Sequence, residues 1–415
     1  MTTTTPAPTR TFKFSWTDSF LWGIRVMSIF VIVWGFAGAI ALGIEGNGLS
    51  LDAWKQLIIS GLAQGSMYGL LALGYSMVYG VLGFINFAHG EVFMVGAIVG
   101  FYTADALFEA GIWESNFILS IVVVLAVAMA SSTLTAVLIE KIAYRPLRNA
   151  PRLIPLITSI GISFFIQNAV QLLVGPAVKN YPAPPKWLSD PINVLGIEIP
   201  GTAILVLTLA FISMLGLWLF VERSTTGRSM RAVAEDKEIA ALMGINVDRV
   251  IVTTFAVGGA MAGVAALLWA LMFRGVSFIT GFLPGIKAFT AAVLGGIGNI
   301  VGAMLGGILL GLFEGLGPNV VLRGLAWQIP SALAIVLLIV GVIGVIGGRT
   351  FNRKGIVVLG AAAIVMGFTG VIGFTIVIPG LSQLKDVVSF TALVLVLIFK
   401  PSGLFGEKLG REDRV

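Results

Sequence analysis

The sequence contains no cysteine and only one histidine, His89, among its 415 residues. Without cysteine there can be no disulfide, no thiolate nucleophile and no cysteine-ligated metal. Charged residues are also scarce at 11%, whereas a typical soluble domain carries about 25%. These absences exclude thiol chemistry and argue against a soluble globular domain.

Motifs for nucleotide and metal binding are missing as well. There is no G-x-x-x-x-G-K-[ST] phosphate-binding loop, so the chain is not expected to be an ATPase. A G-x-G sequence occurs in a glycine-rich region, but no strand pattern precedes it, which argues against a dinucleotide site. One histidine with one neighbouring carboxylate supplies too few ligands for a metal. We therefore expect no cofactor and no metal in this chain.

Apolar residues dominate the composition instead. They make up 57% of the chain, the mean hydropathy is +1.00, and several apolar stretches are at least about 18 residues long. The apolar stretches are continuous rather than alternating, which favours helices over a barrel. The sequence predicts an all-α polytopic membrane protein with about ten transmembrane helices plus short re-entrant or broken helices.

The hydropathy pattern divides the chain into five segments. The expected order is a disordered cytoplasmic N-terminus (1–20), a transmembrane anchor (21–44), a core (55–325), a transmembrane hairpin (326–380), and a final transmembrane helix with a cytoplasmic tail (381–415). Segment 21–44 could be a secretory signal peptide, but its apolar part exceeds the usual 7–15 residues, which favours a retained anchor. Region 284–316 predicts two short helical pieces rather than one span.

The basic residues predict the orientation of the chain. A sequence pI of about 9.6 is compatible with nucleic-acid binding, but the positions of the basic residues favour membrane topology. Nineteen of the 26 lysines and arginines fall in five short segments. Successive spans cross the membrane in opposite directions. If region 284–316 enters and leaves on the same side, all five basic segments lie on one side of the membrane. That side is expected to be cytoplasmic, so both termini are inside, 178–200 is the largest outer loop, and no nucleic-acid partner is expected.

Loop 222–249, expected on the cytoplasmic side, is the most informative segment of the sequence. Its alanine-rich sequence predicts a helix from Met230 to Met243, ended by Gly244 as the C′ residue. Charged residues at 235–238 keep this helix out of lipid. Apolar contact surface is expected from Val233, Ile239, Ala240, Leu242 and Met243. The segment is either a solvated connector or a docking element for a cytoplasmic partner that supplies energy or regulation.

Four motifs resemble one known family. "GRSMRAVAEDKEIAALMGINVDRV" (227–250) resembles the cytoplasmic signature of ABC importer permeases for branched-chain amino acids and sugars. Three further motifs resemble the LivH-type permease of branched-chain amino acid importers: "GYSMVYGVLGFINFAHGEVFMVGAIV" (74–99), "AFTAAVLGGIGNIVGAMLGGILLG" (288–311) and "FKPSGLFGE" (399–407). The resemblance covers roughly 55–325 and 385–407.

This resemblance implies a permease subunit of an ATP-driven importer in the bacterial inner membrane. Such a subunit forms half of a translocation path for branched-chain or related amino acids. Its implied partners are a second permease, two cytoplasmic ATPases that bind ATP and Mg²⁺, a periplasmic substrate-binding protein and membrane lipid. Carried over from the resemblance, the coupling contacts are Ala234, Glu235, Asp236, Ile239, Ala240 and Gly244.

Other functions are compatible with parts of the sequence. Relatives that carry urea or short amides share the same motifs. A self-contained secondary transporter would use His89 and Glu91 to handle protons, and a structural membrane protein would leave motif 227–250 unexplained. The chain also departs from the family pattern, because the anchor 21–44 and the hairpin 326–380 are additional to it.

Glycines repeat every four residues near position 300. Gly298, Gly302 and Gly306 form one series, and Gly307, Gly311 and Gly315 form a second. This spacing predicts a helix face on which another backbone packs closely, or a part of the subunit interface or path. Lys287 and Glu314 are isolated charges in the same region. Such charges are often functional, although both could simply reach the membrane interface.

The stretch "GFINFAHGEVFM" (83–94) concentrates polar residues in apolar surroundings. Its glycines predict a broken helix, with Asn86 as the N-cap and Glu91 in the first turn, near the positive end of the helix dipole. We assign Asn86, His89, Gly90 and Glu91 to this break or to the translocation path. A structural role, direct contact with the substrate and a proton relay all fit; a catalytic dyad would lack a nucleophile.

Overall fold

The computed structural model describes residues 16–148, 150–151, 153–194, 197–325, 331–350, 354–372 and 384–406. The long helices are α1 (Trp16–Ile44), α2 (Leu51–Leu82), α3 (His89–Glu109), α5 (Phe117–Ile139), α6 (Leu153–Val174), α8 (Gly201–Arg223), α9 (Thr225–Glu235), α11 (Val247–Phe273), α12 (Phe282–Gly295), α13 (Ile300–Gly317), α15 (Ser331–Thr350), α16 (Lys354–Ile372) and α17 (Lys385–Phe399). The short elements are α4 (Ile112–Ser115), α7 (Lys186–Ser189), α10 (Lys237–Leu242), α14 (Arg323–Leu325), the helical turns η1 (Glu140–Tyr144), η2 (Arg145–Leu147) and η3 (Pro318–Leu322), and the strands β1 (Lys179–Asn180), β2 (Pro191–Val194), β3 (Ile197–Pro200) and β4 (Gly275–Val276).

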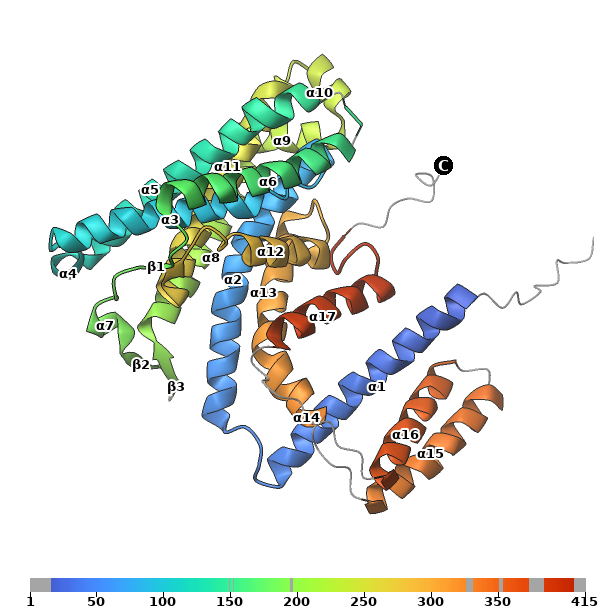
Figure 1. Ribbon diagram of the computed structural model, residues 1–415. Coiled ribbons are helices and arrows are strands. Elements are labelled where there is room, and N and C mark those ends of the chain that lie inside the picture. The colour runs from blue at the N-terminus through green and yellow to red at the C-terminus, as the bar shows by residue number, and fades with distance from the viewer. Residues whose placement is uncertain are drawn as a thin grey trace, which may run out of the picture. The chain divides into compact units, whose positions relative to one another are not determined.

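The structure is almost entirely helical (Figure 1). Within the described residues, eight helical stretches are long and apolar enough to cross a membrane, and three shorter apolar helices accompany them. This confirms the prediction of an all-α polytopic membrane protein. The predicted division of region 284–316 into two helical pieces is confirmed, because α12 ends at Gly295 and α13 begins at Ile300. The prediction that both pieces are short is wrong, because the second belongs to a stretch of 26 residues, Ile300–Leu325, that is long enough to cross a membrane.

The chain folds into two compact units. Unit 1 contains α1, η3, α14, α15 and α16, and unit 2 contains the other elements. In unit 1, aromatic residues of α1 pack in a small core: the rings of Phe30 and Trp34 meet edge to face, with centroids 5.2 Å apart. Helices α15 and α16 pack backbone to backbone where a Cβ at Gly360 would lie 2.8 Å from the carbonyl oxygen of Gly341. The predicted anchor supplies α1 and the predicted hairpin supplies α15 and α16, whereas η3 and α14 come from the end of the predicted core.

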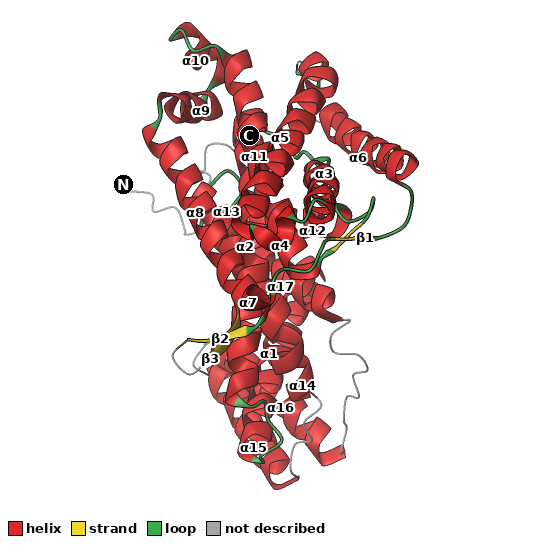
Figure 2. Cartoon of the chain, turned by 90° about the vertical axis from the view of Figure 1, so that its left-hand side faces the viewer, coloured by secondary structure: helices red, strands yellow, loops and turns green. Residues whose placement is uncertain are grey.

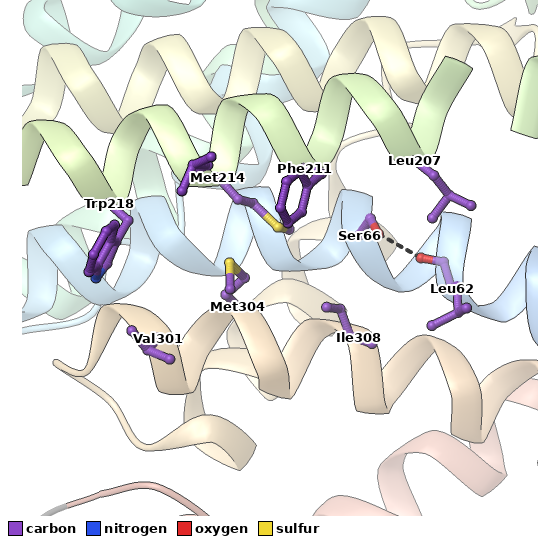
Figure 3. Close-up of a pocket in the computed structure, with 10 residues that line it drawn as sticks. Leu62, Ser66, Leu207, Phe211, Met214, Trp218, Val301, Met304 and Ile308 are labelled. Atoms are coloured by element: carbon purple, nitrogen blue, oxygen red, sulfur yellow. Dashed lines mark hydrogen bonds between the residues drawn. The ribbon is translucent and has the colours of Figure 1, made fainter. Parts of the chain in front are cut away.

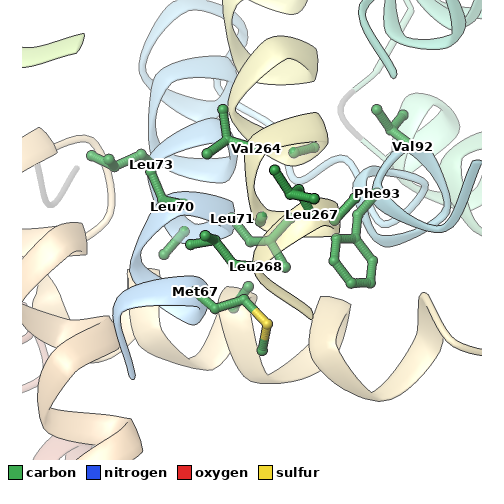
Figure 4. Packing of buried hydrophobic residues seen from close by; sticks show 14 of the residues in the cluster. Met67, Leu70, Leu71, Leu73, Val92, Phe93, Val264, Leu267 and Leu268 are labelled. Carbon is green, nitrogen blue, oxygen red and sulfur yellow. The ribbon is translucent and has the colours of Figure 1, made fainter. Parts of the chain in front are cut away.

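Unit 2 has its core around α2, against which α3, α8, α11, α12 and α13 pack. Figure 4 shows apolar side chains of α2, α3 and α11 meeting in this core. The labelled residues are Met67, Leu70, Leu71, Leu73, Val92, Phe93, Val264, Leu267 and Leu268. Burial of such side chains stabilises the contact by roughly 1.5–3 kcal/mol each relative to water, but against lipid the close fit itself matters more.

The glycines of α13 lie at two close helix contacts. Gly302 and Gly306 lie against Gly295 and Ala291 of α12, whereas Gly307 and Gly311 lie against the backbone of α2 at Gly65 and Gly69. A Cβ at these positions would overlap with the facing backbone. Small residues therefore permit an approach that larger side chains would block.

Gly298 does not belong to this helix face, so its assignment to the packing series is wrong. It lies in the turn between α12 and α13 with φ +93°, a left-handed conformation that favours glycine. Its N–H donates to the Ser76 hydroxyl at 3.0 Å. Gly298 fits the four-residue spacing of Gly302 and Gly306 although it lies in a turn, because that turn also requires a glycine.

Two short strand pairs lie in the segments that connect the long helices of unit 2. Strand β1 pairs with β4, and β2 forms an antiparallel hairpin with β3. The N–H of Tyr181, next to β1, donates to the carbonyl oxygen of Arg274 at 2.9 Å, and the Tyr181 hydroxyl donates to the carbonyl oxygen of Ala97 in α3 at 2.6 Å. Burial raises the pKa of Tyr181 well above its ordinary value, so this residue remains a neutral donor that holds the connection to α3.

Candidate functional site

The break between α2 and α3 begins at Gly83. This residue adopts a left-handed conformation, with φ 78°, and its N–H donates to the carbonyl oxygen of Tyr79 at 2.7 Å. Helix α3 starts at His89, with Ala88 as the N-cap residue. The predicted break is therefore confirmed, but the prediction that Asn86 is the N-cap is wrong.

Asn86 acts inside the break instead of capping the helix. Its side-chain oxygen accepts the N–H of Ala88 at 3.1 Å, which closes a local turn. The same oxygen accepts the hydroxyl of Tyr144 at 2.6 Å. Both residues are buried, so this bond fixes the break to η1 at the end of α5.

His89 points toward α2 and α11. Its ring meets that of Tyr75 edge to face, with centroids 4.9 Å apart. Gly74 faces the imidazole so closely that a Cβ there would overlap with the ring, and a Cβ at Gly258 would lie 3.7 Å from its Cε1 atom. The side chain is only 2% exposed, and its Nε2 atom has no hydrogen-bond partner among the described residues. The imidazole thus fills the space that two glycines leave between three helices.

Gly90 and Glu91 connect the start of α3 to two other helices. A Cβ at Gly90 would lie 3.0 Å from the Cα atom of Gly285 in α12. The Glu91 carboxylate is buried, and its Oε1 atom accepts the amide of Gln167 at 2.6 Å and the hydroxyl of Ser163 at 3.1 Å. As predicted, Glu91 lies in the first turn of α3, and its carboxylate binds α6.

The four residues assigned to the break are neighbours along the chain, but their side chains do not form one site. Asn86 contacts η1, His89 contacts α2, and Glu91 contacts α6. The side chains of His89 and Glu91 thus make different ring and hydrogen-bond contacts. This arrangement suits a joint that fastens several helices to the beginning of α3 rather than a proton relay between His89 and Glu91.

Ionic contacts continue from this joint to the start of α11. The guanidinium of Arg148 pairs with the buried carboxylate of Glu140 and with Asp248, and Arg145 binds Asp248 at 3.1 Å. Glu140 lies in η1, the same turn as Tyr144. Both arginines are among the basic residues that were interpreted from the sequence only as signals of membrane topology. In the structure they also hold the end of α5 to α11.

Segment 225–244 is not the single helix that the sequence predicted from Met230 to Met243. Helix α9 ends at Glu235, and α10 begins at Lys237. Asp236 has an extended backbone, and its carboxylate accepts the N–H groups of Glu238 at 2.8 Å and Ile239 at 2.9 Å. It is thus an N-cap that turns the chain between two short helices. We call residues 225–244, which contain α9, Asp236, α10, Met243 and Gly244, the elbow.

The elbow ends at Gly244, as predicted from the sequence. Gly244 has φ 85°, its N–H donates to the carbonyl oxygen of Ala241, and the N–H of Ile245 donates to that of Ala240. These two bonds form a Schellman motif. Figure 2 shows α9 and α10 together, at the end of α8 that is remote from the β2–β3 hairpin.

The elbow exposes most of the residues predicted to contact an ATPase. Ala234, Glu235, Asp236, Ile239 and Gly244 are exposed. Ala240 is an exception, because it is only 3% exposed within the core of unit 2. It is therefore a packing residue, and its assignment as a direct contact is wrong.

The sequence prediction of coupling contacts omitted two prominent residues of the elbow. Leu242 and Met243 are 87% and 78% exposed, and Ile239 is 59% exposed. Their spacing of i, i+3 and i+4 places them on one side of α10. Leu242 and Met243 were recognised only as apolar surface, because sequence alone does not say which apolar positions of a short helix face the protein. We call Ile239, Leu242 and Met243 the apolar trio.

Lys287 and Glu314 are not isolated, although they are far apart in sequence. The Lys287 ammonium binds the Glu314 carboxylate at 2.8 Å and Asp386 of α17 at 2.6 Å. Gln64 of α2 also donates to Glu314, at 2.8 Å. The charges therefore meet one another within unit 2.

An apolar groove of about 470 Å³ lies between α2, α8 and α13 (Figure 3). Its lining residues are Leu62, Ser66, Leu207, Phe211, Met214, Leu215, Trp218, Val301, Met304 and Ile308. The Ser66 hydroxyl donates to the carbonyl oxygen of Leu62 at 2.7 Å, so it is already engaged. The groove offers apolar surface but little to hold the charged ends of an amino acid, and we do not assign it as a substrate site.

Comparison with known proteins identifies the family to which the chain is similar. The family described as "Branched-chain amino acid transport system / permease component" matches residues 57–343. The high-affinity branched-chain amino acid transport system permease protein BraD of Pseudomonas aeruginosa is 42% identical over 355 residues, which cover 85% of this chain and 96% of BraD. The permease protein LivH of the same kind of system, from Salmonella typhimurium and from Escherichia coli K12, is 42% identical over 294 residues, which cover 70% of this chain and 95% of LivH. No solved structure matches.

Proposed function

The chain belongs to the branched-chain amino acid transport permease family, and from this premise we propose that it is the membrane permease subunit of an ATP-driven importer for branched-chain amino acids. Its partners would be a second permease, two cytoplasmic ATPases and a substrate-binding protein outside the membrane. ATP and Mg²⁺ would bind to the ATPases. The membrane would be the bacterial inner membrane, with both termini of the chain in the cytoplasm.

The apolar trio is the observation that carries this proposal. Large apolar side chains at the end of a charged, water-facing segment are costly unless a partner covers them. The trio projects from a helix whose two ends are fixed by Asp236 and Gly244. A short, rigid, apolar projection suits insertion into a groove on a cytoplasmic protein, in which a few buried anchors supply most of the affinity.

The elbow is also attached to the membrane core, as transmission of motion requires. The Lys237 ammonium donates to the carbonyl oxygen of Leu82, the last residue of α2, at 3.3 Å. The Arg231 guanidinium donates to the carbonyl oxygen of Val221 in α8 at 2.6 Å. A displacement of the elbow by an ATPase would therefore reach α8 and the beginning of the break.

The break has a supporting role in this proposal. Asn86, His89, Gly90 and Glu91 hold α3 against η1, α2, α12 and α6. Broken helices at transport sites leave backbone groups free for ligands, so the break would lie close to the path while its side chains keep the path in shape. The contacts that these residues make with several helices favour this structural role over a self-contained proton-driven transporter.

A pull-down experiment tests the docking proposal. The affinity-tagged chain would be coexpressed with the ATPase subunits of its own transport system, and captured ATPase would be quantified. Replacing Leu242 and Met243 together by Asp should reduce capture at least tenfold, equivalent to about 1.4 kcal/mol. Ala241→Asp is the matched control, because Ala241 is exposed on the opposite side of α10 from the trio. Equal capture by all three proteins would overturn the proposal.

A further inference from the structure

The segment that follows α17 is not part of the break or of the elbow. It comprises residues 400–406, which are most of the motif "FKPSGLFGE" (399–407). Pro401 ends α17, because proline cannot continue a helix. Gly403 turns the chain with φ 79°, a left-handed conformation that favours glycine. Figure 1 shows this segment returning to the end of α12, and we call it the strap.

The strap binds the last turn of α12. An α-helix leaves its last four carbonyl groups without partners inside the helix. In α12 the first two of these four accept the N–H of the residue that follows the helix. The other two accept from the strap. Leu404 donates its N–H to the carbonyl oxygen of Leu294 at 2.8 Å. Phe405 donates its N–H to that of Gly295 at 3.0 Å. The strap therefore completes the C-terminal cap of α12.

The strap also fixes the turn between α12 and α13. The side-chain amide of Asn299 donates to the carbonyl oxygen of Phe405 at 3.0 Å. The side-chain oxygen of Asn299 accepts the N–H of Gly302, in the first turn of α13, at 2.9 Å. A Cβ at Gly296 would lie 2.4 Å from the backbone nitrogen of Gly406, so the two backbones meet closely. The end of α12 and the beginning of α13 are thus held by the same short segment.

Helix α17 is fixed to α12 at both of its ends. Asp386 in the first turn of α17 binds the ammonium of Lys287 in α12 at 2.6 Å. At the other end of α17, the strap binds the last turn of α12. Loss of the strap would therefore leave the ion pair in place and free only the C-terminal end of α12.

Helix α12 extends from the break to a position beside the elbow. At its beginning, a Cβ at Gly90 of the break would lie 2.5 Å from the carbonyl oxygen of Gly281. After its end, a small cavity of about 70 Å³ separates Gly298 of the turn from Arg231 of the elbow, and both residues line it. The helix has 14 residues, which makes it roughly 21 Å long at about 1.5 Å per residue. A stable α12 therefore connects the two regions.

We propose that the strap is a positioning element for transport, which closes the end of α12 so that a displacement of the elbow reaches the break through this helix. Without the strap, the last turn of α12 loses two of its hydrogen-bond donors and frays. The displacement is then absorbed at the turn and does not arrive at the break. This inference rests on the proposed function of the elbow, which supplies the movement.

Hydrogen exchange and transport measurements test the strap in the full-length chain, within its transport complex in lipid. Leu404→Pro removes the N–H that donates to Leu294, whereas the control Leu404→Ala shortens the side chain but keeps the N–H. In Leu404→Pro, amides of residues 292–299 should exchange roughly tenfold faster. ATPase capture should be unchanged, because the elbow is intact, while leucine uptake per ATP hydrolysed should fall several-fold. Leu404→Ala should match wild type in all three measurements.

A second pair of variants removes the other donor of the strap. Phe405→Pro eliminates the N–H that binds Gly295 and should reproduce the effects of Leu404→Pro, with Phe405→Ala as its control. Normal exchange in both proline variants, or faster exchange with unchanged uptake per ATP, would overturn the proposal. Equal losses in the proline and alanine variants would also overturn it. Failure of the proposed function would be recognised separately, because the wild-type chain would then capture no ATPase.

Discussion

The break between α2 and α3 and the elbow both interrupt helices, but one buries polar side chains and the other exposes apolar side chains. The break buries an amide, an imidazole and a carboxylate. The elbow exposes three large apolar side chains. Polar side chains are usually exposed and large apolar side chains are usually buried. Both regions reverse this preference, so the side chains in each region require partners.

The difference lies in where the partner is. Asn86 and Glu91 find their partners within the chain, in Tyr144 and Gln167, and His89 packs against Tyr75. The apolar trio is exposed on the chain itself, as expected of a surface that another subunit covers. The comparison teaches that rare polar groups in a membrane protein can be structural, while ordinary apolar residues carry an interaction.

The largest effect is expected at His89. Replacing it by Ala would leave a cavity between α2, α3 and α11, and large-to-small core changes of this kind cost about 2–5 kcal/mol. We expect a lower midpoint of thermal unfolding in detergent, with ATPase capture unchanged in the fraction that remains folded. His89→Gln, which keeps more of the volume but cannot titrate, should retain uptake. Full stability of His89→Ala with loss of uptake would assign His89 to the path instead.

The next effect concerns the cap of α10. Asp236→Ala removes the acceptor for the N–H groups of Glu238 and Ile239, which costs about 0.5–2 kcal/mol of local helix stability. Hydrogen exchange at these two amides should accelerate, and ATPase capture should fall several-fold. Asp236→Asn conserves the cap and serves as the control. Unchanged exchange in the alanine variant would show that the cap does not hold the elbow.

A smaller effect is expected where the break is tied to η1. Tyr144→Phe removes the hydroxyl that donates to Asn86, and a single hydrogen bond of this kind contributes about 0.5–1.5 kcal/mol. A double-mutant cycle with Asn86→Ala should give a coupling energy of that size in thermal unfolding. Strictly additive effects of the two substitutions would mean that the bond does not stabilise the break.

The smallest effect joins the two regions. Lys237→Met removes the donor to the carbonyl oxygen of Leu82 but keeps a long apolar stem, so stability should change by less than about 1 kcal/mol. ATPase capture should be normal, because the apolar trio is intact, while uptake per ATP hydrolysed should fall modestly. Unchanged coupling between hydrolysis and uptake would show that this contact does not transmit motion.

Local sequence signals predicted a large part of this fold. Continuous apolar stretches indicated the helices, glycines indicated the break after α2 and the division between α12 and α13, and Gly244 indicated the end of the elbow. These features depend on backbone conformation and short-range periodicity, which are encoded within a few residues. The break was therefore placed correctly, although the start of α3 was misplaced because Asn86 binds Tyr144 from another helix.

The contacts that define the sites could not be predicted in the same way. Asn86 and Tyr144 are 58 residues apart in the chain, and Lys287 and Glu314 are 27 apart. Their pairing depends on which helices become neighbours. Asp236 was missed as a cap because an aspartate in an alanine-rich stretch resembles any solvated helical residue until the backbone turns. Ala240 was wrongly predicted as a coupling contact, and Leu242 was left out of those contacts, because the sequence does not show which side of α10 packs on the core.

The most direct test of the account is uptake of radiolabelled leucine into proteoliposomes under two driving forces. One preparation contains the complete transport complex, supplied with the binding protein and ATP. The other contains this chain alone under an imposed proton gradient. The account predicts uptake in the complex that requires ATP and fails when Leu242 and Met243 are replaced by Asp. Proton-driven uptake by the chain alone would contradict it.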